Sequence, residues 1–389
     1  MPGLEKALET EKCSAYLGTD PTADSLHVGN LSSLMLLIHF QKYGHTPIVL
    51  MGGATGMVGD PSGKSKERNL LSEADIQKNL DGQRKQMENL FDFNAKDNSA
   101  LMVNNYDWYK EMNILEFLRD IGKHLTINYM SAKDSVKKRI ESGLSFTEFS
   151  YQLIQGYDFY YLWKNYNCKV QLGGSDQWGN ITSGTELIRK MGGGEAYALT
   201  CPLITKADGS KFGKSESGAV WLDAKKTSPY KFFQFWLNAS DTDAEQYIKK
   251  FTLLGKEEID TLIAEHNEVP HQRILQKRLA KEVTTFIHGE AAYEGAVKAT
   301  QILFKEGVPT YTISKAKHGD ALKAIDFLSE ETGILPSKSE ARRALQQNSI
   351  SINMEKIPAD YEITTKDFLN NEFILVQKGR KNKYLVIAE

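Results

Sequence analysis

A strand–helix–strand pattern near the start of the chain constrains its fold more than any other feature. Residues 14–18 read as a short strand, residues 31–43 carry apolar side chains at helical spacing, and residues 47–51 form an apolar strand after Gly44. A right-handed crossover of this length makes the two strands parallel neighbours whose carboxyl ends face one crevice. We therefore predict an α/β domain with a parallel sheet, and we expect its ligands to bind at that crevice.

The α/β domain is expected to cover residues 1–226. It includes a later strand at 169–172, which runs into a glycine-rich turn where the backbone can approach a ligand closely. Residues 227–305 show helical periodicity and little strand signal, so we predict a helical domain there. Residues 306–318 lack any periodicity, which is typical of a linker.

A third domain is expected over residues 319–389. Ser337 and Glu340 fit a capping box at the start of a helix that ends near Gln347. Residues 349–353 then alternate as a strand does. The sequence therefore predicts a small α+β domain after the helical one.

Charge and cysteine content limit the class of protein. The 389-residue chain has 48 Lys and Arg against 50 Asp and Glu, so any nucleic-acid contact must come from local patches. Cys13, Cys168 and Cys201 lack a zinc-type spacing, so we expect free thiols, no structural zinc and no other resident metal. No stretch is apolar enough for a membrane span or a signal peptide. A cytoplasmic protein is the expectation.

The first candidate site lies between the first strand and the first helix, at residues 20–30. A helix N-terminus there offers free N–H groups to phosphates, Gly29 admits close approach, and His27 can donate a hydrogen bond to a phosphoryl oxygen. The alternative is an ordinary helix cap with an incidental histidine.

Two further segments, residues 59–65 and 209–215, resemble phosphate loops. Neither is a Walker A loop, because each has three residues between its glycines where that motif needs four. They remain two glycine-flanked loops with lysines, suited to holding a polyphosphate as its charge rearranges. The alternative is a solvated turn with surface lysines.

A polar helix face forms a third candidate. Tyr151, Gln155 and Asp158 stand at positions i, i+4 and i+7, so a helix over residues 149–161 would present all three on one face. Aromatic residues flank them, and polar groups in such a setting need either one another or a polar small molecule as partners. A polar face in water is the alternative.

Together these segments resemble the class I aminoacyl-tRNA synthetases, and more closely the bacterial and mitochondrial-type tyrosyl-tRNA synthetases. The resemblance covers nearly the whole chain, and its most specific parts are residues 20–27, 52–64, 145–151, 173–180 and 206–215. The family's His-Ile-Gly-His signature corresponds to residues 27–30, and its Lys-Met-Ser-Lys-Ser signature corresponds to residues 211–215.

The resemblance implies a Rossmann-like catalytic domain with an inserted dimerisation segment, a helical anticodon-side domain and a small RNA-binding domain. It implies a homodimer that activates L-tyrosine with ATP and Mg²⁺ and transfers the tyrosyl group to tRNA(Tyr). Organellar location is as compatible with it as bacterial cytoplasm.

The resemblance also assigns residues to roles. For catalysis these are Thr22, His27, Asn30, Lys64, Arg68, Lys211, Lys214 and Ser215. For tyrosine they are Tyr16, Asp60, Tyr151, Gln155, Asp158 and Gln177. For ATP they are Gly18, Asp20, His27, Gly29, Asn30, Asp176 and Lys214, and for tRNA they are Lys338, Arg342 and Arg343.

Two rival interpretations stay open at this point. A tryptophanyl-tRNA synthetase shares the architecture but not the pairing of Tyr16 with Asp158. A catalytically silent relative that only binds RNA would be favoured by loss of Asp158 or the signature lysines, and these are present. Asn30 departs from the family pattern because it replaces the second signature histidine, and its amide cannot carry charge.

Overall fold

The computed structural model describes residues 3–62, 71–140, 143–207, 209, 212–215, 218–303, 309–314, 321–353, 355–369, 373–379 and 382–388. Within these ranges, the backbone but not the side chain is described for six residues, at positions 135, 138, 214, 215, 302 and 303. The chain divides into two units, Met1–Asp223 and Ala224–Glu389.

A five-stranded parallel sheet forms the centre of the first unit, in the order β3-β2-β1-β4-β5. Its strands are β1 (Ser14–Thr19), β2 (Thr46–Met51), β3 (Leu101–Asn104), β4 (Cys168–Gly174) and β5 (Tyr197–Cys201). The strand order changes direction between β1 and β4, which is where open α/β sheets bind ligands. The predicted parallel sheet is confirmed.

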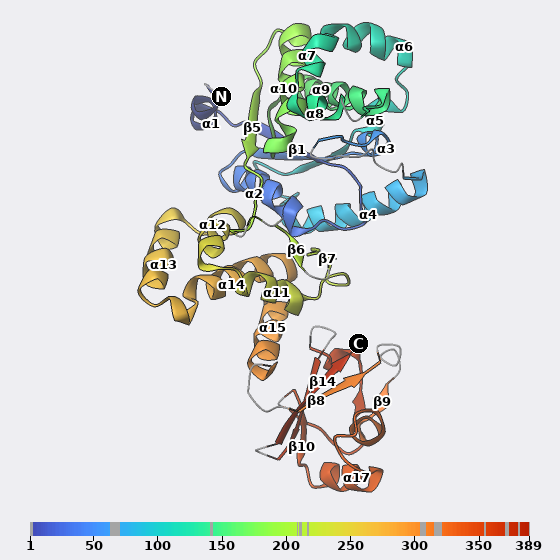
Figure 1. Ribbon diagram of the computed structural model, residues 1–389, viewed down its shortest axis with the longest axis vertical. Coiled ribbons are helices and arrows are strands. Elements are labelled where there is room, and N and C mark those ends of the chain that lie inside the picture. The colour runs from blue at the N-terminus through green and yellow to red at the C-terminus, as the bar shows by residue number, and fades with distance from the viewer. Residues whose placement is uncertain are drawn as a thin grey trace. The chain divides into compact units, whose positions relative to one another are not determined.

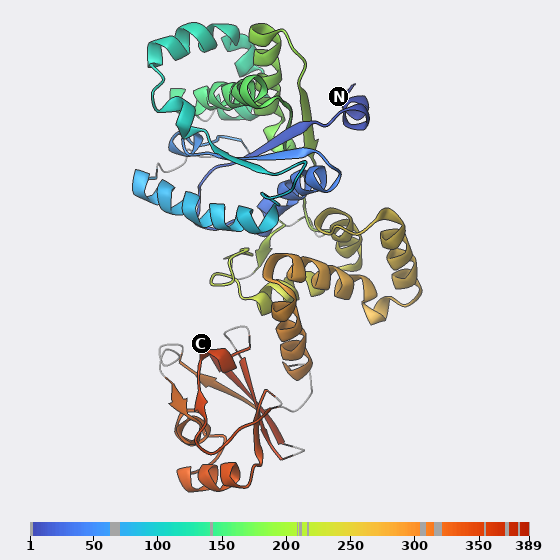
Figure 2. The ribbon, with the colours of Figure 1, turned by 180° about the vertical axis from the view of Figure 1, so that it is seen from behind.

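Helices cover both faces of this sheet. Figures 1 and 2 show α2 (Val28–Lys42) and α4 (Glu73–Leu90) on one face, with α9 (Phe146–Tyr166) and α10 (Trp178–Leu187) on the other. The α2 helix ends at Lys42, and Gly44 with φ of 90° turns the chain into β2. Both faces of the strands are thereby buried, which explains their nearly continuous apolar sequences.

Short helices fill the remainder of the unit. A seven-residue helix, α1, precedes β1, and several short helical segments lie between β3 and α9. Their bounds are α1 (Leu4–Thr10), α3 (Thr55–Val58), α5 (Tyr106–Tyr109), α6 (Ile114–Glu116), η1 (Phe117–Ile121), η2 (Gly122–His124), α7 (Ile127–Ser131), α8 (Asp134–Ile140), η3 (Ser175–Gln177) and η4 (Ile188–Gly192). A small hairpin of β6 (Lys214–Ser215) and β7 (Gly218–Ala219) follows β5.

The second unit begins with helices, as the periodicity of its sequence predicts. They are α11 (Pro229–Leu237), α12 (Asp241–Phe251), α13 (Lys256–Glu268), η5 (Pro270–Gln272), α14 (Ile274–His288) and α15 (Glu290–Leu303). The aromatic residues Phe232, Trp236, Tyr247 and Phe251 are buried between them.

A mixed five-stranded sheet closes the unit, in the order β11-β10-β13-β14-β8. Its strands are β8 (Thr310–Ile313), β10 (Ile350–Ile352), β11 (Glu355–Lys356), β13 (Phe373–Lys378) and β14 (Asn382–Ala388). The smaller elements are β9 (Leu322–Lys323), α16 (Ala324–Asp326), η7 (Phe327–Glu331), α17 (Lys338–Gln346), β12 (Glu362–Ile363) and η8 (Thr365–Asp367).

Two details of this region differ from the sequence-based prediction. Part of the expected linker 306–318 is the strand β8, which pairs in parallel with β14, since Thr310 to Ile313 gain their order from a tertiary partner. At α17, Ser337 Oγ accepts the N–H of Glu340 as predicted, but the Glu340 carboxylate pairs with Lys378 Nζ at 2.7 Å. Among the described residues, no helix is both long and apolar enough to cross a membrane.

Candidate functional site

The candidate site lies at the carboxyl ends of β1 and β4, where the strand order reverses. Asp20 follows β1 directly, and Asp176 and Gln177 follow β4. The α9 helix begins at Phe146, where Ser145 Oγ caps it by accepting the Glu148 N–H, and it carries Tyr151, Gln155 and Asp158 along the sheet.

Asp158 is buried, and its carboxylate accepts hydrogen bonds from neutral donors. Asn105 Nδ2 donates to one carboxylate oxygen at 3.1 Å, and Trp108 Nε1 donates to the other at 2.9 Å. Burial raises the pKa of Asp158 to about 7, although hydrogen bonds from Asn105, Trp108 and Tyr109 lower it. A buried carboxyl group of this kind is suited to accept a further hydrogen bond from a polar ligand.

Tyr16 lies near Asp158 and is buried, with 1% of the residue exposed. Its hydroxyl group has no hydrogen-bond partner among the residues that the structure describes, and burial together with the charge of Asp158 raises the pKa of this phenol well above its usual value. A buried hydroxyl without a partner is costly, since its lost hydration is not replaced. A ligand hydroxyl between Tyr16 and Asp158 would satisfy it.

Asp60 is the centre of a second polar cluster. Its carboxylate accepts hydrogen bonds from Gln177 Nε2 at 2.7 Å, from the Ser62 N–H at 2.9 Å and from Asn180 Nδ2 at 3.3 Å. Asn180 Nδ2 also lies 3.1 Å from Gln155 Oε1, so Asp60, Gln155 and Gln177 meet around this one amide. These donors are neutral, which leaves the negative charge of Asp60 available to a cationic group.

Tyr151 joins the two clusters. Its hydroxyl donates to Asp20 Oδ2 at 2.8 Å, and Thr55 Oγ1 donates to Asp20 Oδ1 at 2.7 Å. Asp20, Asp60 and Asp158 all raise the pKa of the Tyr151 phenol, after the larger effect of burial. Asp20 thus contacts this hydroxyl, and the charges of Asp60 and Asp158 also act on it, an arrangement that favours a bound ammonium group.

The first signature forms a cap at the start of α2. The His27 N–H donates to Asn30 Oδ1 at 3.0 Å, and the Asn30 N–H donates to His27 Nδ1 at 3.3 Å. Since Nδ1 accepts a hydrogen bond, the ring proton of the neutral imidazole is on Nε2. The backbone N–H of Asn30 therefore orients the His27 imidazole, while the Asn30 side-chain amide caps the helix by accepting the His27 backbone N–H, which requires no charge.

The second signature lies beside the first. A Cβ added to Gly213, whose φ is 78°, would be 3.0 Å from Val28 Cγ2 and 3.5 Å from the backbone nitrogen of Gly29. The Val220 N–H donates to Gly213 O, and the Val28 N–H donates to Val220 O. Lys214 and Ser215 follow in β6, where only their backbone is described.

The other predicted residues are distributed as follows. Gly18 and Thr22 are exposed, at the end of β1 and in the loop that leads to α2. Gly29, in the first turn of α2, and Asp176, after β4, are partly exposed. Lys64, Arg68 and Lys211 lie outside the described residues. In the second unit, Arg342 and Arg343 are exposed on α17, whereas Lys338 forms ion pairs with Asp326 at 2.7 Å and Glu330 at 2.9 Å.

Four site residues have no assigned role in the sequence-based prediction: Thr55, Asn105, Trp108 and Asn180. Asn105 is fully buried, and besides its bond to Asp158 it donates to Thr55 Oγ1 at 3.0 Å and accepts the Ala54 N–H at 2.7 Å. Its position after β3, at the carboxyl end of a strand, is the signal that points to it. Nothing local distinguishes Thr55 or Asn180.

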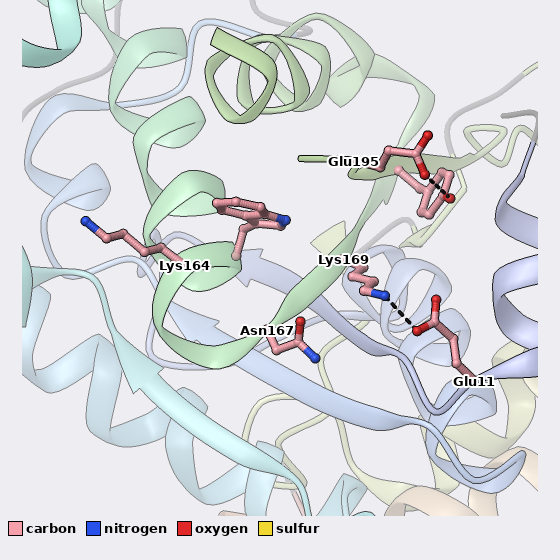
Figure 3. Close-up of a pocket in the computed structure, with 7 residues that line it drawn as sticks. Glu11, Lys164, Asn167, Lys169 and Glu195 are labelled. Carbon is pink, nitrogen blue, oxygen red and sulfur yellow. Dashed lines mark hydrogen bonds and ion pairs between the residues drawn. The ribbon is translucent and has the colours of Figure 1, made fainter. Parts of the chain in front are cut away.

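A separate cavity of about 520 Å³ lies near the amino ends of the strands. Figure 3 shows Lys169 and Glu11 pointing toward each other across it, with their ion pair at 2.7 Å, while Lys164 points away. Its lining includes the charged residues Glu11, Lys164, Lys169 and Glu195, and it contains none of the predicted site residues. Among the residues that the structure describes, no group of three or more His, Cys, Asp or Glu could hold a metal ion.

Comparison with protein families gives two matches. The family described as tRNA synthetases class I (W and Y) matches residues 8–305. The family described as the tyrosine--tRNA ligase SYY-like C-terminal domain matches residues 300–387.

Individual proteins are similar over the whole chain. A tyrosine--tRNA ligase of Flavobacterium johnsoniae is 56% identical over 411 aligned positions, which cover 99% of this chain and 95% of that protein. One from Bacteroides fragilis is also 56% identical and covers 100% of this chain. Among solved structures, a C-terminally truncated mitochondrial tyrosyl-tRNA synthetase of Aspergillus nidulans superposes with a TM-score of 0.68. It is 31% identical and covers 76% of this chain and 86% of that one.

Proposed function

The chain belongs to the class I tRNA synthetases of the tryptophan and tyrosine group, and from this premise we propose that it is a tyrosine--tRNA ligase. It activates L-tyrosine with ATP to tyrosyl-adenylate and transfers the tyrosyl group to the 3′ end of tRNA(Tyr). The buried, unpartnered hydroxyl of Tyr16 beside the buried carboxyl group of Asp158 carries the choice of tyrosine.

Tyrosine binds with its phenol between Tyr16 and Asp158. The phenol hydroxyl donates to Asp158 and accepts from Tyr16, which satisfies the buried Tyr16 hydroxyl. The substrate ammonium group lies by Asp60, Tyr151 and Gln155, where the surrounding carboxyl groups complement its charge. Gln177 contacts the carboxylate end of the substrate.

The same two groups account for the rejection of phenylalanine. A phenylalanine would leave Tyr16 and Asp158 without partners, and this cost is the source of the selectivity. Tyrosyl-tRNA synthetases are themselves the standard example of discrimination by an unsatisfied polar site, so the principle is general to the family. In this chain, Tyr16 and Asp158 are the two residues that would be left without hydrogen-bond partners.

ATP binds over the loop between β1 and α2, with Mg²⁺ accompanying its phosphates. The tyrosine carboxylate attacks the α-phosphorus and pyrophosphate leaves, so no protein side chain forms a covalent bond. His27 donates from Nε2 toward the phosphates because Asn30 occupies its Nδ1. Further residues act on the phosphates, and these are Thr22, Lys64, Arg68, Lys211, Lys214 and Ser215. The nucleoside is contacted by Gly18, Asp20, Gly29 and Asp176.

The terminal part of the chain binds tRNA through α17. Arg342 and Arg343 are exposed there and contact RNA phosphates. Lys338 contributes less, since its ammonium group is paired with Asp326 and Glu330.

Two copies of the chain form a homodimer through the segment between β3 and α9. This segment and the first residue of α9 expose large apolar side chains, which a separate monomer would leave in water: Tyr106 (41%), Ile114 (65%), Leu115 (72%), Leu118 (47%), Ile127 (71%), Ile140 (51%) and Phe146 (76%). The three free thiols fit a reducing compartment, and we assign the enzyme to the cytoplasm of a bacterium.

Amino-acid-dependent exchange of pyrophosphate into ATP tests the activity. We expect exchange with tyrosine and at least about a thousandfold less with phenylalanine or tryptophan, because a site built for a hydroxyl group rejects the analogue that lacks it, as tyrosyl-tRNA synthetases are known to do. Exchange that tryptophan supports and tyrosine does not would replace this proposal by a tryptophan ligase. No exchange with any amino acid would indicate a silent relative.

A further inference from the structure

Three side-chain amides of α4 hold the loop that carries Thr22 and His27. Asn79, Gln83 and Gln86 stand at positions i, i+4 and i+7, so they share one face of the helix. We propose that this amide row, defined as Asn79, Gln83 and Gln86, positions the nucleotide loop for adenylate formation. The proposal rests on the proposed tyrosine--tRNA ligase activity.

Gln83 interrupts the apolar face of α4. Ile76, Leu80, Met87 and Leu90 are buried along this helix, and Gln83 lies among them with 2% of its surface exposed. An apolar residue would be the default at such a position, because burial of an amide is costly unless all its hydrogen bonds are made.

The Gln83 amide makes a full set of bonds to the loop. Its Nε2 donates to Ala23 O at 3.0 Å and to Asp20 O at 3.3 Å, and its Oε1 accepts from Thr19 Oγ1 at 3.2 Å. Both amide hydrogens and the carbonyl oxygen therefore bind the end of β1 and the start of the loop.

Gln86 and Asn79 bind the loop on either side. Gln86 Oε1 accepts the Leu26 N–H at 2.7 Å, and its Nε2 donates to Ser25 Oγ at 2.9 Å. Asn79 Nδ2 donates to Pro21 O at 2.8 Å. The bond to Leu26 is one residue from His27, so it fixes the chain where the cap of α2 begins.

The loop has no regular secondary structure of its own between Asp20 and Leu26, so its backbone groups depend on partners from outside. Helix and loop are in close contact, since a Cβ added to Gly82 would collide with Asp24 O. A loop held in this way presents Thr22 and His27 without an entropic cost at the moment of reaction. The amide row acts through the loop and touches no substrate, so its members are positioning residues.

The test compares Gln86→Met and Gln86→Glu with Gln77→Met in tyrosine-dependent pyrophosphate exchange. Gln77 is the matched control, because it is exposed on the same helix and its amide bonds only to Asp81 in the described contacts. We expect Gln86→Met to lower kcat/KM for ATP about tenfold and to change KM for tyrosine by less than about twofold. Gln86→Glu keeps the acceptor for Leu26 and should recover most of the activity.

At Gln83, the expected order of activity of the Met and Glu variants is the reverse of the order at Gln86. A carboxylate at Gln83 cannot donate to the carbonyls of Asp20 and Ala23, so Gln83→Glu should lose more activity than Gln83→Met. Hydrogen exchange of the peptide 20–27 should become faster in Gln86→Met and in both Gln83 variants, but not in Gln77→Met.

Three results would overturn the amide row. The first is an unchanged kcat/KM for ATP in Gln86→Met. The second is an equal loss of kcat/KM for ATP and for tyrosine in that variant. The third is equal activity of the Met and Glu variants at either position. If the unmodified protein shows no exchange with tyrosine, the proposed function fails instead, and the hydrogen-exchange comparison still tests whether the amides hold the loop.

Discussion

Ionisation of Asp158 destabilises the folded chain, because its carboxyl group is buried. Burial raises its pKa from 3.8 to about 7, so the folded protein binds a proton that the unfolded chain releases between these pH values. The free energy of unfolding therefore falls as the pH rises from the unfolded to the folded pKa of Asp158, by about 1.4 kcal/mol per pH unit. This effect ends once the pH exceeds the folded pKa.

The substitution Asp158→Asn isolates that effect. Between pH 5 and pH 8 the unmodified protein should lose about 2 to 3 kcal/mol of unfolding free energy relative to Asp158→Asn, because only Asp158 must ionise in the buried site. Urea unfolding of both proteins at the two pH values measures the difference. Parallel pH profiles would mean that Asp158 is already ionised at pH 5.

Trp108 supports the ionised form of Asp158 through its indole N–H. Trp108→Phe keeps a ring in place but removes this donor, so tyrosine should bind about tenfold more weakly. Calorimetric titration with tyrosine measures the change. Trp163→Phe is the control, because Trp163 lines the separate cavity and this variant should bind tyrosine as the unmodified protein does.

At the scale of elements, a buried ion pair fastens α8 to α9. Arg139 Nη2 lies 2.6 Å from Glu148 Oε2, and the two side chains are 5% and 2% exposed. Removal of one partner leaves a buried charge, so Arg139→Met should cost about 3 kcal/mol of unfolding free energy. The double variant Arg139→Met/Glu148→Leu should regain much of that loss.

Denaturant unfolding of the single and double variants measures this coupling. Arg119→Met is the control, since its pair with Asp120 is mostly exposed and should change stability little. A single variant as stable as the control would show that the pair does not hold α9, which carries Tyr151, Gln155 and Asp158.

The sequence predicts elements well where periodicity is local. It places the helix with Tyr151, Gln155 and Asp158 over 149–161, and the observed helix spans Phe146–Tyr166. It does not predict the strand β8, because the four residues of that strand gain order only by pairing with β14. Likewise, Gln83 owes its role to a partner more than fifty residues away in sequence, which no local pattern encodes. The position of Asn105 after β3 points to a site residue, but not to its distant partner Asp158.

At the scale of the whole molecule, the terminal sheet lies in a part of the chain separate from the strand ends that form the site. Because β8 belongs to that sheet, a clean truncation must end before it, at residue 308. The shortened chain should retain tyrosine-dependent pyrophosphate exchange within about twofold and lose at least about tenfold in charging of tRNA(Tyr). Equal loss of both activities would show that the terminal part supports the catalytic fold.

The selectivity of Asp158→Ala for tyrosine over phenylalanine shows whether Asp158 recognises the phenol of the substrate. In the proposed site, Asp158 accepts a hydrogen bond from the phenol hydroxyl of the substrate. Removal of the carboxylate should therefore strongly lower the rate of pyrophosphate exchange with tyrosine and lower the rate with phenylalanine much less. The measurement is kcat/KM for both amino acids in the unmodified protein and the variant. We expect the ratio of kcat/KM for tyrosine to kcat/KM for phenylalanine to fall in the variant. An equal proportional loss for both substrates would mean that Asp158 does not recognise the phenol.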